Sequence, residues 1–249
     1  MRVLFVTQFA AHFHYFKSII RSLLKRGYEV KLLIIAHEKY NKAEYLEAIE
    51  EFKKEFPNFE CASVKMRADN FSAKLLFLAR DIANWRKYFL VEGQSNYYQD
   101  RLLRFFPAWV VFFLNLEFMK RFLKSKFFGR LIGRIESFYR PAKEIIDDIM
   151  EFKPDVLLAS PVNMRRNFFM TDLEYLKAAR ALKIPSIIPI ISWDNLTTKG
   201  IFHVWPDLFL VWNEVQKNEA KEHHNIPDEK MKVIGAPLFD GWFSDLKPS

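Results

Sequence analysis

The chain has 249 residues, of which 50% are hydrophobic and 27% charged, and this composition excludes a disordered or collagen-like polymer. At roughly 150 residues per domain, this length predicts one or two domains. The 38 Lys and Arg residues exceed the 30 Asp and Glu residues by eight, which favours an anionic surface or a phosphorylated ligand as partner. One cysteine, Cys61, excludes an intrachain disulfide and a zinc ribbon, so we expect a reducing compartment.

Targeting segments are not expected. Only Arg2 precedes the apolar stretch Val3 to Val6, which is too short for the apolar region of a signal peptide. The longest nearly uncharged run, Phe105 to Leu116, is about half of the roughly 20 residues that a membrane-spanning helix needs. The sequence therefore predicts a cytoplasmic protein, either free or peripheral on the inner face of the cell membrane.

Strands and helices alternate in the first 65 residues. Gly27 follows a helical pattern that ends in two basic residues, and a glycine there favours a helix C-terminus. Val30 to Ile35 shows almost no polar alternation, which is typical of a parallel strand covered on both faces. The predicted elements are a strand 2–6, a helix 15–26, a strand 28–35, a helix 42–56 and a strand 60–65.

The alternation returns after Pro154. The predicted elements there are strands 155–159, 186–191, 208–212 and 232–234, with helices 172–182 and 214–223. Strands that alternate with helices of this length indicate right-handed crossovers. The fold class predicted is α/β, a doubly wound, mostly parallel Rossmann-like sheet of about seven strands with a helical, basic and aromatic insertion.

The insertion is predicted at about 85–140. This stretch holds 11 Lys and Arg against four Asp and Glu, and 16 of the 41 aromatic side chains of the chain. Pro107 is predicted to open a long helix that carries Phe112 through Phe128. Its aromatic residues either pack on the sheet and on each other, or they contact an anionic membrane surface or a lipid-linked substrate. We expect no nucleic-acid partner, because no RNA-recognition motif is present.

Ligands of an open parallel sheet bind beyond the carboxyl ends of its strands. The loop after the first strand has Ala10 and Ala11 instead of the glycines of a dinucleotide site, so we expect no dinucleotide cofactor. His12 is either a general base for a substrate hydroxyl or a structural histidine. The pairs His12/His14 and His223/His224 lack a third ligand nearby, so we predict no metal.

The loops after the later strands are also polar. Arg165 and Arg166 either bind phosphate or are solvated. Asp194 and Asn195 either bind substrate hydroxyls or fix their own loop through Asx turns. Glu214 either stabilises the start of a helix or faces the cleft.

Two parts of the sequence resemble a known group of proteins. The opening RVLFVTQFAAHFHYFKSIIRSLLKRGYEVKLL resembles the start of GT-B glycosyltransferases, with a strand, a loop ending in histidine and a helix ending in RGYEV. The later segments SWDN, VWNE-x-Q and GAP-x-FD resemble bacterial proteins of the CDP-glycerol glycerophosphotransferase-like group. The resemblance covers about 120 residues at the two ends of the chain.

The resemblance implies that residues 1–249 form the N-terminal, acceptor-side domain of a GT-B glycosyltransferase. The donor-binding domain is then expected to be on another polypeptide, to have been removed from this one, or to have been lost, and the chain alone is expected to be inactive. The acceptor would be a cell-envelope or lipid-linked glycan, and a nucleotide-activated sugar or CDP-glycerol would be a co-substrate, with no resident cofactor. Half of a UDP-GlcNAc 2-epimerase-like enzyme and a non-catalytic membrane-surface module are the alternatives.

Site residues follow from the loops and the resemblance together. His12 is expected as the catalytic base. The expected substrate-binding residues are His14, Arg165, Arg166, Ser192, Asp194, Asn195, Lys199 and Glu214.

Overall fold

The computed structural model describes residues 1–35, 41–90, 96–161, 171–240 and 242. The strands in these residues form one seven-stranded sheet in the order β3-β2-β1-β4-β5-β6-β7, and every neighbouring pair is parallel. The strands are β1 (Arg2–Thr7), β2 (Glu29–Ile34), β3 (Phe59–Ser63), β4 (Val156–Ala159), β5 (Ser186–Pro189), β6 (Leu208–Val211) and β7 (Met231–Val233). The predicted α/β class and all seven predicted strands are confirmed.

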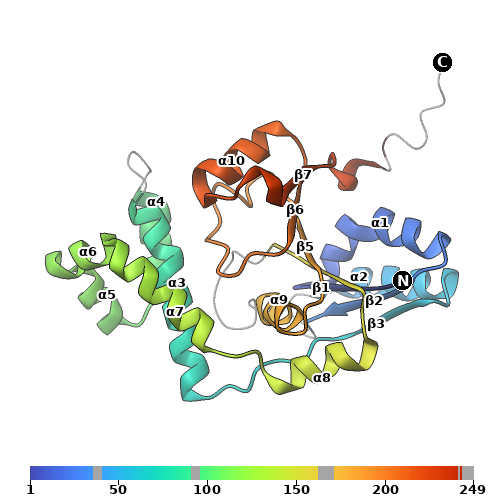
Figure 1. Ribbon diagram of the computed structural model, residues 1–249, viewed down its shortest axis with the longest axis horizontal. Helices are drawn as coiled ribbons and strands as arrows, with labels where there is room; N and C mark the ends of the chain where they lie inside the picture. The colour runs from blue at the N-terminus through green and yellow to red at the C-terminus, as the bar shows by residue number, and fades with distance from the viewer. Residues whose placement is uncertain (36–40, 91–95, 162–170, 241, 243–249) are drawn as a thin grey trace.

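Helices cover both faces of this sheet and extend to one side of it (Figure 1). They are α1 (Phe13–Lys25), α2 (Ala43–Glu55), α3 (Phe71–Leu90), α4 (Asn96–Leu103), α5 (Ala108–Asn115), α6 (Glu117–Lys124), α7 (Lys126–Phe138), α8 (Lys143–Phe152), α9 (Thr171–Ala181) and α10 (Glu214–His224). Three short 3-10 helices, η1 (Ala10–His12), η2 (Asp228–Lys230) and η3 (Pro237–Phe239), lie among them. Within the described ranges, none of the helices combines the length and the apolarity needed to cross a bilayer.

Alternate residues of the central strand β1 face two separate cores. Val3 and Phe5 pack with apolar residues of α1 and α2, whereas Leu4 and Val6 pack with residues of α8 and α9. Because successive side chains of a strand point to opposite faces, a strand covered on both faces needs an apolar residue at every position. This arrangement explains why β1 and β2 read as nearly continuous apolar runs.

The helical insertion between β3 and α8 has a core of its own. Trp85 of α3 packs there with residues of α5, α6 and α7, among them Val110, Leu114, Leu123 and Phe128. Helices α3 to α7 form the part of the molecule that lies farthest from α1 and α2 in Figure 1. The aromatic residues predicted for this segment therefore serve partly to fold the insertion.

The prediction of one long helix after Pro107 is wrong. The backbone is extended at Leu116 and at Ser125, and it divides the segment into the separate helices α5, α6 and α7. The hydroxyl of Ser125 accepts the backbone N–H of Phe128 and so caps α7. The two breaks turn the chain so that Leu114, Leu123 and Phe128 all reach the same core.

A buried ion cluster joins the insertion to the sheet domain. Arg80 of α3 is 1% exposed and donates to both carboxylate oxygens of Glu136 on α7, at 2.8 and 2.7 Å, and to Glu174 on α9 at 2.6 Å. Lys177 also pairs with Glu136, and Arg67 with Glu174. Burial by itself raises the pKa of Glu136, but Arg80 and Lys177 lower it to about 2. Five charged side chains thus fix α3 and α7 against α9.

Candidate functional site

The sheet changes its winding direction between β1 and β4. After β1 the chain runs through α1 to β2 on one side, whereas β4 and the later strands follow on the other side. In an open parallel sheet, the loops at such a point separate and leave a crevice at the carboxyl ends of the two strands. A ligand site is therefore expected among the residues that follow β1 and β4.

Three buried polar side chains meet at this point: Gln8 after β1, Ser160 after β4, and Asp172 at the start of α9. The Ser160 hydroxyl donates a short hydrogen bond to Oδ2 of Asp172, and the Gln8 side chain also hydrogen-bonds to this carboxyl. The other oxygen, Oδ1, is buried and has no hydrogen-bond partner among the described residues. We refer to Gln8, Ser160 and Asp172 as the switch-point cluster.

The environment of Asp172 suits proton transfer. Burial raises the pKa of Asp172 to about 7, although the hydrogen bonds from Ser160, Gln8 and the backbone act in the opposite direction. A carboxyl group with such a pKa exchanges its proton near neutral pH, as a general acid or base must. Sequence reasoning recognised Asp172 only as the start of a helix.

His12 ends η1, at the mouth of α1. Its ring makes edge contacts with Phe9 and Tyr15, with centroids 5.2 and 5.9 Å away. Burial lowers the pKa of His12 to about 4, so the imidazole is neutral at pH 7. The Nδ1 atom is buried and has no hydrogen-bond partner in the part of the chain described here. The neutral ring keeps one nitrogen able to accept a proton.

The loop after β5 is held largely by its own side chains. Oδ1 of Asn195, which is buried, accepts the backbone N–H groups of Ile191 and Ser192. Asp194 accepts the Ser192 hydroxyl at 2.5 Å and pairs with Lys199 at 2.9 Å. Partial burial acts to raise the pKa of Asp194, but these two partners hold it below its usual value. Asp194 and Asn195 therefore fix their own loop, but not through the predicted Asx turns, because among the described residues neither side chain accepts the N–H two residues later. Substrate binding by this loop stays a prediction.

Side chains of helix α3 also hold this loop, through hydrogen bonds to its backbone. The Lys87 ammonium donates to the carbonyl oxygens of Leu196, Thr197, Lys199 and Gly200, at 2.9 to 3.4 Å. Neighbouring side chains of α3 extend this contact: Tyr88 donates to the carbonyl of Thr198, and Asn84 accepts the N–H of Ile201. Burial lowers the pKa of Lys87 to about 8. The helical insertion therefore shapes the loop that the SWDN segment begins.

The VWNE-x-Q segment forms a helix cap. Asn213 accepts the N–H of Gln216 at the start of α10, and Gln216 in turn accepts the N–H of Trp212. Trp212 also donates its indole N–H to the carbonyl of Ile190, the residue that follows β5. Glu214 is exposed in the first turn of α10, where its carboxylate lies 4.0 Å from Lys217. Its observed place suits the predicted role at a helix start.

The GAP-x-FD segment links the last strand to α1. Gly235 has a φ of +82°, a conformation that other residues rarely adopt, and Pro237 then opens η3. The Asp240 carboxylate accepts the Ser18 hydroxyl of α1 at 3.2 Å. His14 is exposed and lines a cleft of about 650 Å³ beside this segment, together with Lys17 and Arg21.

The predicted site residues therefore lie in separate places. Ser192, Asp194, Asn195 and Lys199 share one loop, whereas His14 lines the cleft between α1 and η3 and Glu214 starts α10. Arg165 and Arg166 lie outside the described residues. The switch-point cluster escaped prediction because its members come from three segments up to 164 positions apart, and no spacing motif connects them. In the described ranges, no group of three His, Cys, Asp or Glu side chains could hold a metal ion.

No protein-family model matches the sequence, and no curated protein matches it either. Among solved structures, the chain is similar to the UDP-GlcNAc 2-epimerase from Methanocaldococcus jannaschii, at 13% identity and a TM-score of 0.47, over 96% of this chain and 47% of that one.

Two further solved structures show a similar degree of likeness. Arabidopsis thaliana UGT89C1 complexed with UDP is 13% identical with a TM-score of 0.41, over 94% of this chain and 49% of that one. The calicheamicin glycosyltransferase CalG4 is 10% identical with a TM-score of 0.41, over 94% of this chain and 52% of that one. The chain spans about half the length of each of these structures.

Proposed function

We propose that this chain is the acceptor-binding half of a glycosyltransferase or glycerophosphotransferase whose acceptor is a cell-envelope or lipid-linked glycan. The observation that carries the proposal is the gathering of Gln8, Ser160 and Asp172 at the switch point of the sheet, where such folds receive their ligands. The neutral imidazole of His12 at the mouth of α1 supports it, as does the resemblance carried by the opening of the chain and by the SWDN, VWNE-x-Q and GAP-x-FD segments.

The proposed reaction is the transfer of a sugar or glycerophosphate to an acceptor hydroxyl. The hydroxyl gives its proton to a base on this chain, and its oxygen attacks the anomeric carbon of the sugar or the phosphorus of CDP-glycerol. The bond to the nucleotide breaks, and the nucleotide leaves with the bonding electrons. His12 and Asp172 are the two groups proposed to receive the proton, because each has a buried polar atom, Nδ1 of His12 and Oδ1 of Asp172, without a hydrogen-bond partner among the described residues.

The donor is proposed to bind to a second domain that faces this crevice. Here the loop after β1 lacks the glycines that let a backbone approach a pyrophosphate closely. The cations Arg165 and Arg166 and the loop from Ser192 to Lys199 are proposed to line the acceptor side. The complete enzyme would therefore need both halves.

An assay of products tests this function. The chain, alone and together with the polypeptide that supplies a nucleotide-binding domain, is incubated with labelled nucleotide-sugars or CDP-glycerol and a cell-envelope extract. We expect label in the extract only when both halves are present. Efficient transfer by the chain alone would contradict the half-enzyme proposal. Release of UDP and a 2-epimerised sugar, without transfer, would establish the epimerase alternative instead.

A further inference from the structure

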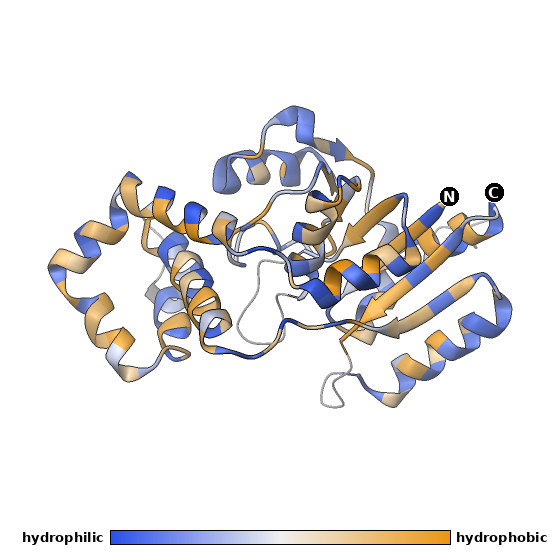
Figure 2. Cartoon of the chain, turned by 60° about the horizontal axis from the view of Figure 1, so that its bottom comes forward, coloured by the Kyte–Doolittle hydropathy of each residue, from blue (hydrophilic) through white to orange (hydrophobic). Residues whose placement is uncertain are grey.

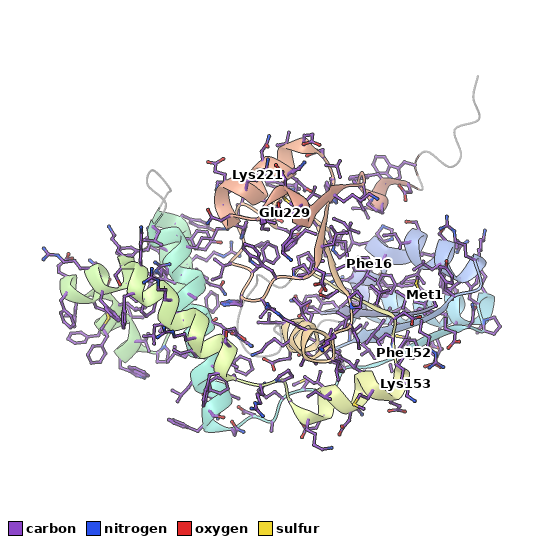
Figure 3. The ribbon with its side chains drawn as sticks, in the orientation of Figure 1. Met1, Phe16, Phe152, Lys153, Lys221 and Glu229 are labelled. Atoms are coloured by element: carbon purple, nitrogen blue, oxygen red, sulfur yellow. The ribbon has the colours of Figure 1, made fainter. Side chains whose placement is uncertain are left out.

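The outer helices of the insertion expose an aromatic face. Trp109, Phe112 and Phe113 of α5 are 59%, 63% and 47% exposed, and Phe118 of α6 and Phe127 of α7 are 64% and 62% exposed. In Figure 3, ring side chains project outward from the region of α5 and α6. Figure 2 shows hydrophobic residues along these helices, although they lie at the outer end of the molecule. We call these five side chains the aromatic tip.

The aromatic tip is not needed to complete the core of the insertion. Positions 109, 112 and 113 follow the i, i+3, i+4 spacing of one helix face. Val110 and Leu114 lie on the opposite face of α5 and are 3% exposed each, in the core with Trp85. A face that the fold leaves in water, while the other face packs fully, is typical of a contact surface.

The segment that carries the aromatic tip is rich in cations. Residues 96–138 carry eight Lys and Arg and three Asp and Glu, a balance of 8 − 3 = +5. One of the three acids, Glu136, is buried and already paired with Arg80. The cations are Arg101, Arg104, Lys120, Arg121, Lys124, Lys126, Arg130 and Arg134. An occupant of this surface must therefore offer both apolar material and negative charge.

We propose that α5 and α6 dock on an anionic lipid surface, with the aromatic tip in the boundary between headgroups and acyl chains. Helices with exposed aromatic residues and flanking cations bind in this way, and each cation near an anionic leaflet adds to the attraction. A second copy of the chain fits poorly, because it would bring two surfaces of charge +5 together. The docking proposal stands on these exposures and charges and is independent of the proposed reaction.

Docking would hold the candidate site in a fixed position relative to the lipid. Lys87, Tyr88 and Asn84 of α3 hold the loop after β5, and Trp85 of the same helix packs in the core of the insertion. The ion cluster around Arg80 fixes α3 against α9, the helix that carries Asp172. If the proposed function holds, an acceptor anchored in the lipid reaches the crevice along the length of the insertion.

Cosedimentation with lipid vesicles tests the docking. The full chain is mixed with vesicles of phosphatidylcholine alone and of phosphatidylcholine with a third of phosphatidylglycerol. We expect binding to the anionic vesicles that weakens at high salt. The triple variant Trp109→Ser/Phe112→Ser/Phe113→Ser and the variant Arg121→Glu/Lys124→Glu should each bind at least about tenfold more weakly.

Matched controls separate docking from general effects. Phe71→Ser removes an aromatic side chain that is 77% exposed at the start of α3, about 20 Å along that helix from Trp85. Lys53→Glu/Lys54→Glu makes the same change of charge on α2. Both controls should bind as the parent does. Equal binding by the parent and the tip variants, or loss of binding in the controls to the same extent, would overturn the proposal.

A depth measurement gives a second readout. Quenching of tryptophan fluorescence by brominated lipids should fall in Trp109→Phe, which keeps an aromatic ring at the tip but removes the reporter. A parent protein that forms dimers through the tip and shows no quenching by lipid would instead establish a protein partner and refute lipid docking.

Discussion

At the scale of single residues, Asp172 is the group whose chemistry departs most from what its neighbours in sequence indicate. Its carboxyl lies between Ser160 and Gln8 in a fully buried position. Burial costs more for the charged form than for the neutral form, and this is why the pKa of Asp172 rises to about 7. Groups with a pKa shifted this far by burial are found mostly at functional sites.

The raised pKa has a consequence for stability. Between about pH 4 and pH 7 the unfolded chain ionises Asp172 while the folded chain keeps its proton, so this group lowers the stability of the fold as the pH rises. The variant Asp172→Asn has no carboxyl group to ionise at this position, so its stability does not fall in this way as the pH rises. Its free energy of unfolding, relative to that of the parent, should therefore increase by about 1 to 4 kcal/mol from pH 5 to pH 8. Urea unfolding at both pH values measures it, and a difference that does not change with pH would contradict the assignment.

A substitution of Arg80 shows what happens when one member of the buried ion cluster is removed. Its loss leaves Glu136 and Glu174 without their shared partner in a place shielded from water. Arg80→Met should therefore lower the free energy of unfolding by about 3 to 5 kcal/mol. Arg21→Met, which breaks a pair with Glu55 at the surface, should cost about 1 kcal/mol or less. Equal losses in the two variants, measured by urea unfolding, would show that the cluster does not stabilise the fold.

At the scale of elements, helix α7 contains a glycine that its position does not require. A Cβ atom at Gly133 would meet no heavy atom within 4 Å. Because alanine loses less backbone entropy than glycine when a helix forms, Gly133→Ala should raise the free energy of unfolding by about 0.5 to 1 kcal/mol.

Gly27 provides the opposite control. It follows α1 with a φ of +78°, in the left-handed region that favours glycine, so Gly27→Ala should lower the free energy of unfolding by about 1 to 2 kcal/mol. Thermal or urea unfolding of both variants measures the two signs. A destabilised Gly133→Ala variant would mean that α7 is strained at this position.

Elements were predictable where a local pattern determines them. The apolar run Val3 to Val6 predicts a buried strand because both of its faces are covered, and Gly27 marks the end of a helix. The breaks at Leu116 and Ser125 were not predictable, since Leu116 favours a helix and the turn depends on packing against Trp85. The polar side chains of the SWDN loop stand out in the sequence, and their role in a site stays a prediction. The contacts of this loop with Lys87 were not predicted, because that residue lies more than 100 positions away from Lys199.

At the scale of the whole molecule, the chain combines a parallel sheet with a helical insertion. The parallel sheet brings the switch-point cluster to the carboxyl ends of β1 and β4, and the insertion reaches the same side through the hold of α3 on the loop after β5. The aromatic tip lies at the far end of that insertion (Figure 1). We propose that the domain holds a lipid-linked acceptor in the crevice at the carboxyl ends of β1 and β4, while the aromatic tip contacts the lipid.

The pH dependence of kcat/KM for transfer, in the enzyme completed by its donor-binding domain, tests the central proposal most directly. We predict that His12→Ala and Asp172→Asn each lower kcat/KM by about 100-fold or more, and that Asp172→Asn removes an inflection near pH 7. His223→Ala, on the outer helix α10, should leave the profile unchanged. Parental rates and an unaltered profile in both His12→Ala and Asp172→Asn would contradict the assignment of proton transfer to this crevice.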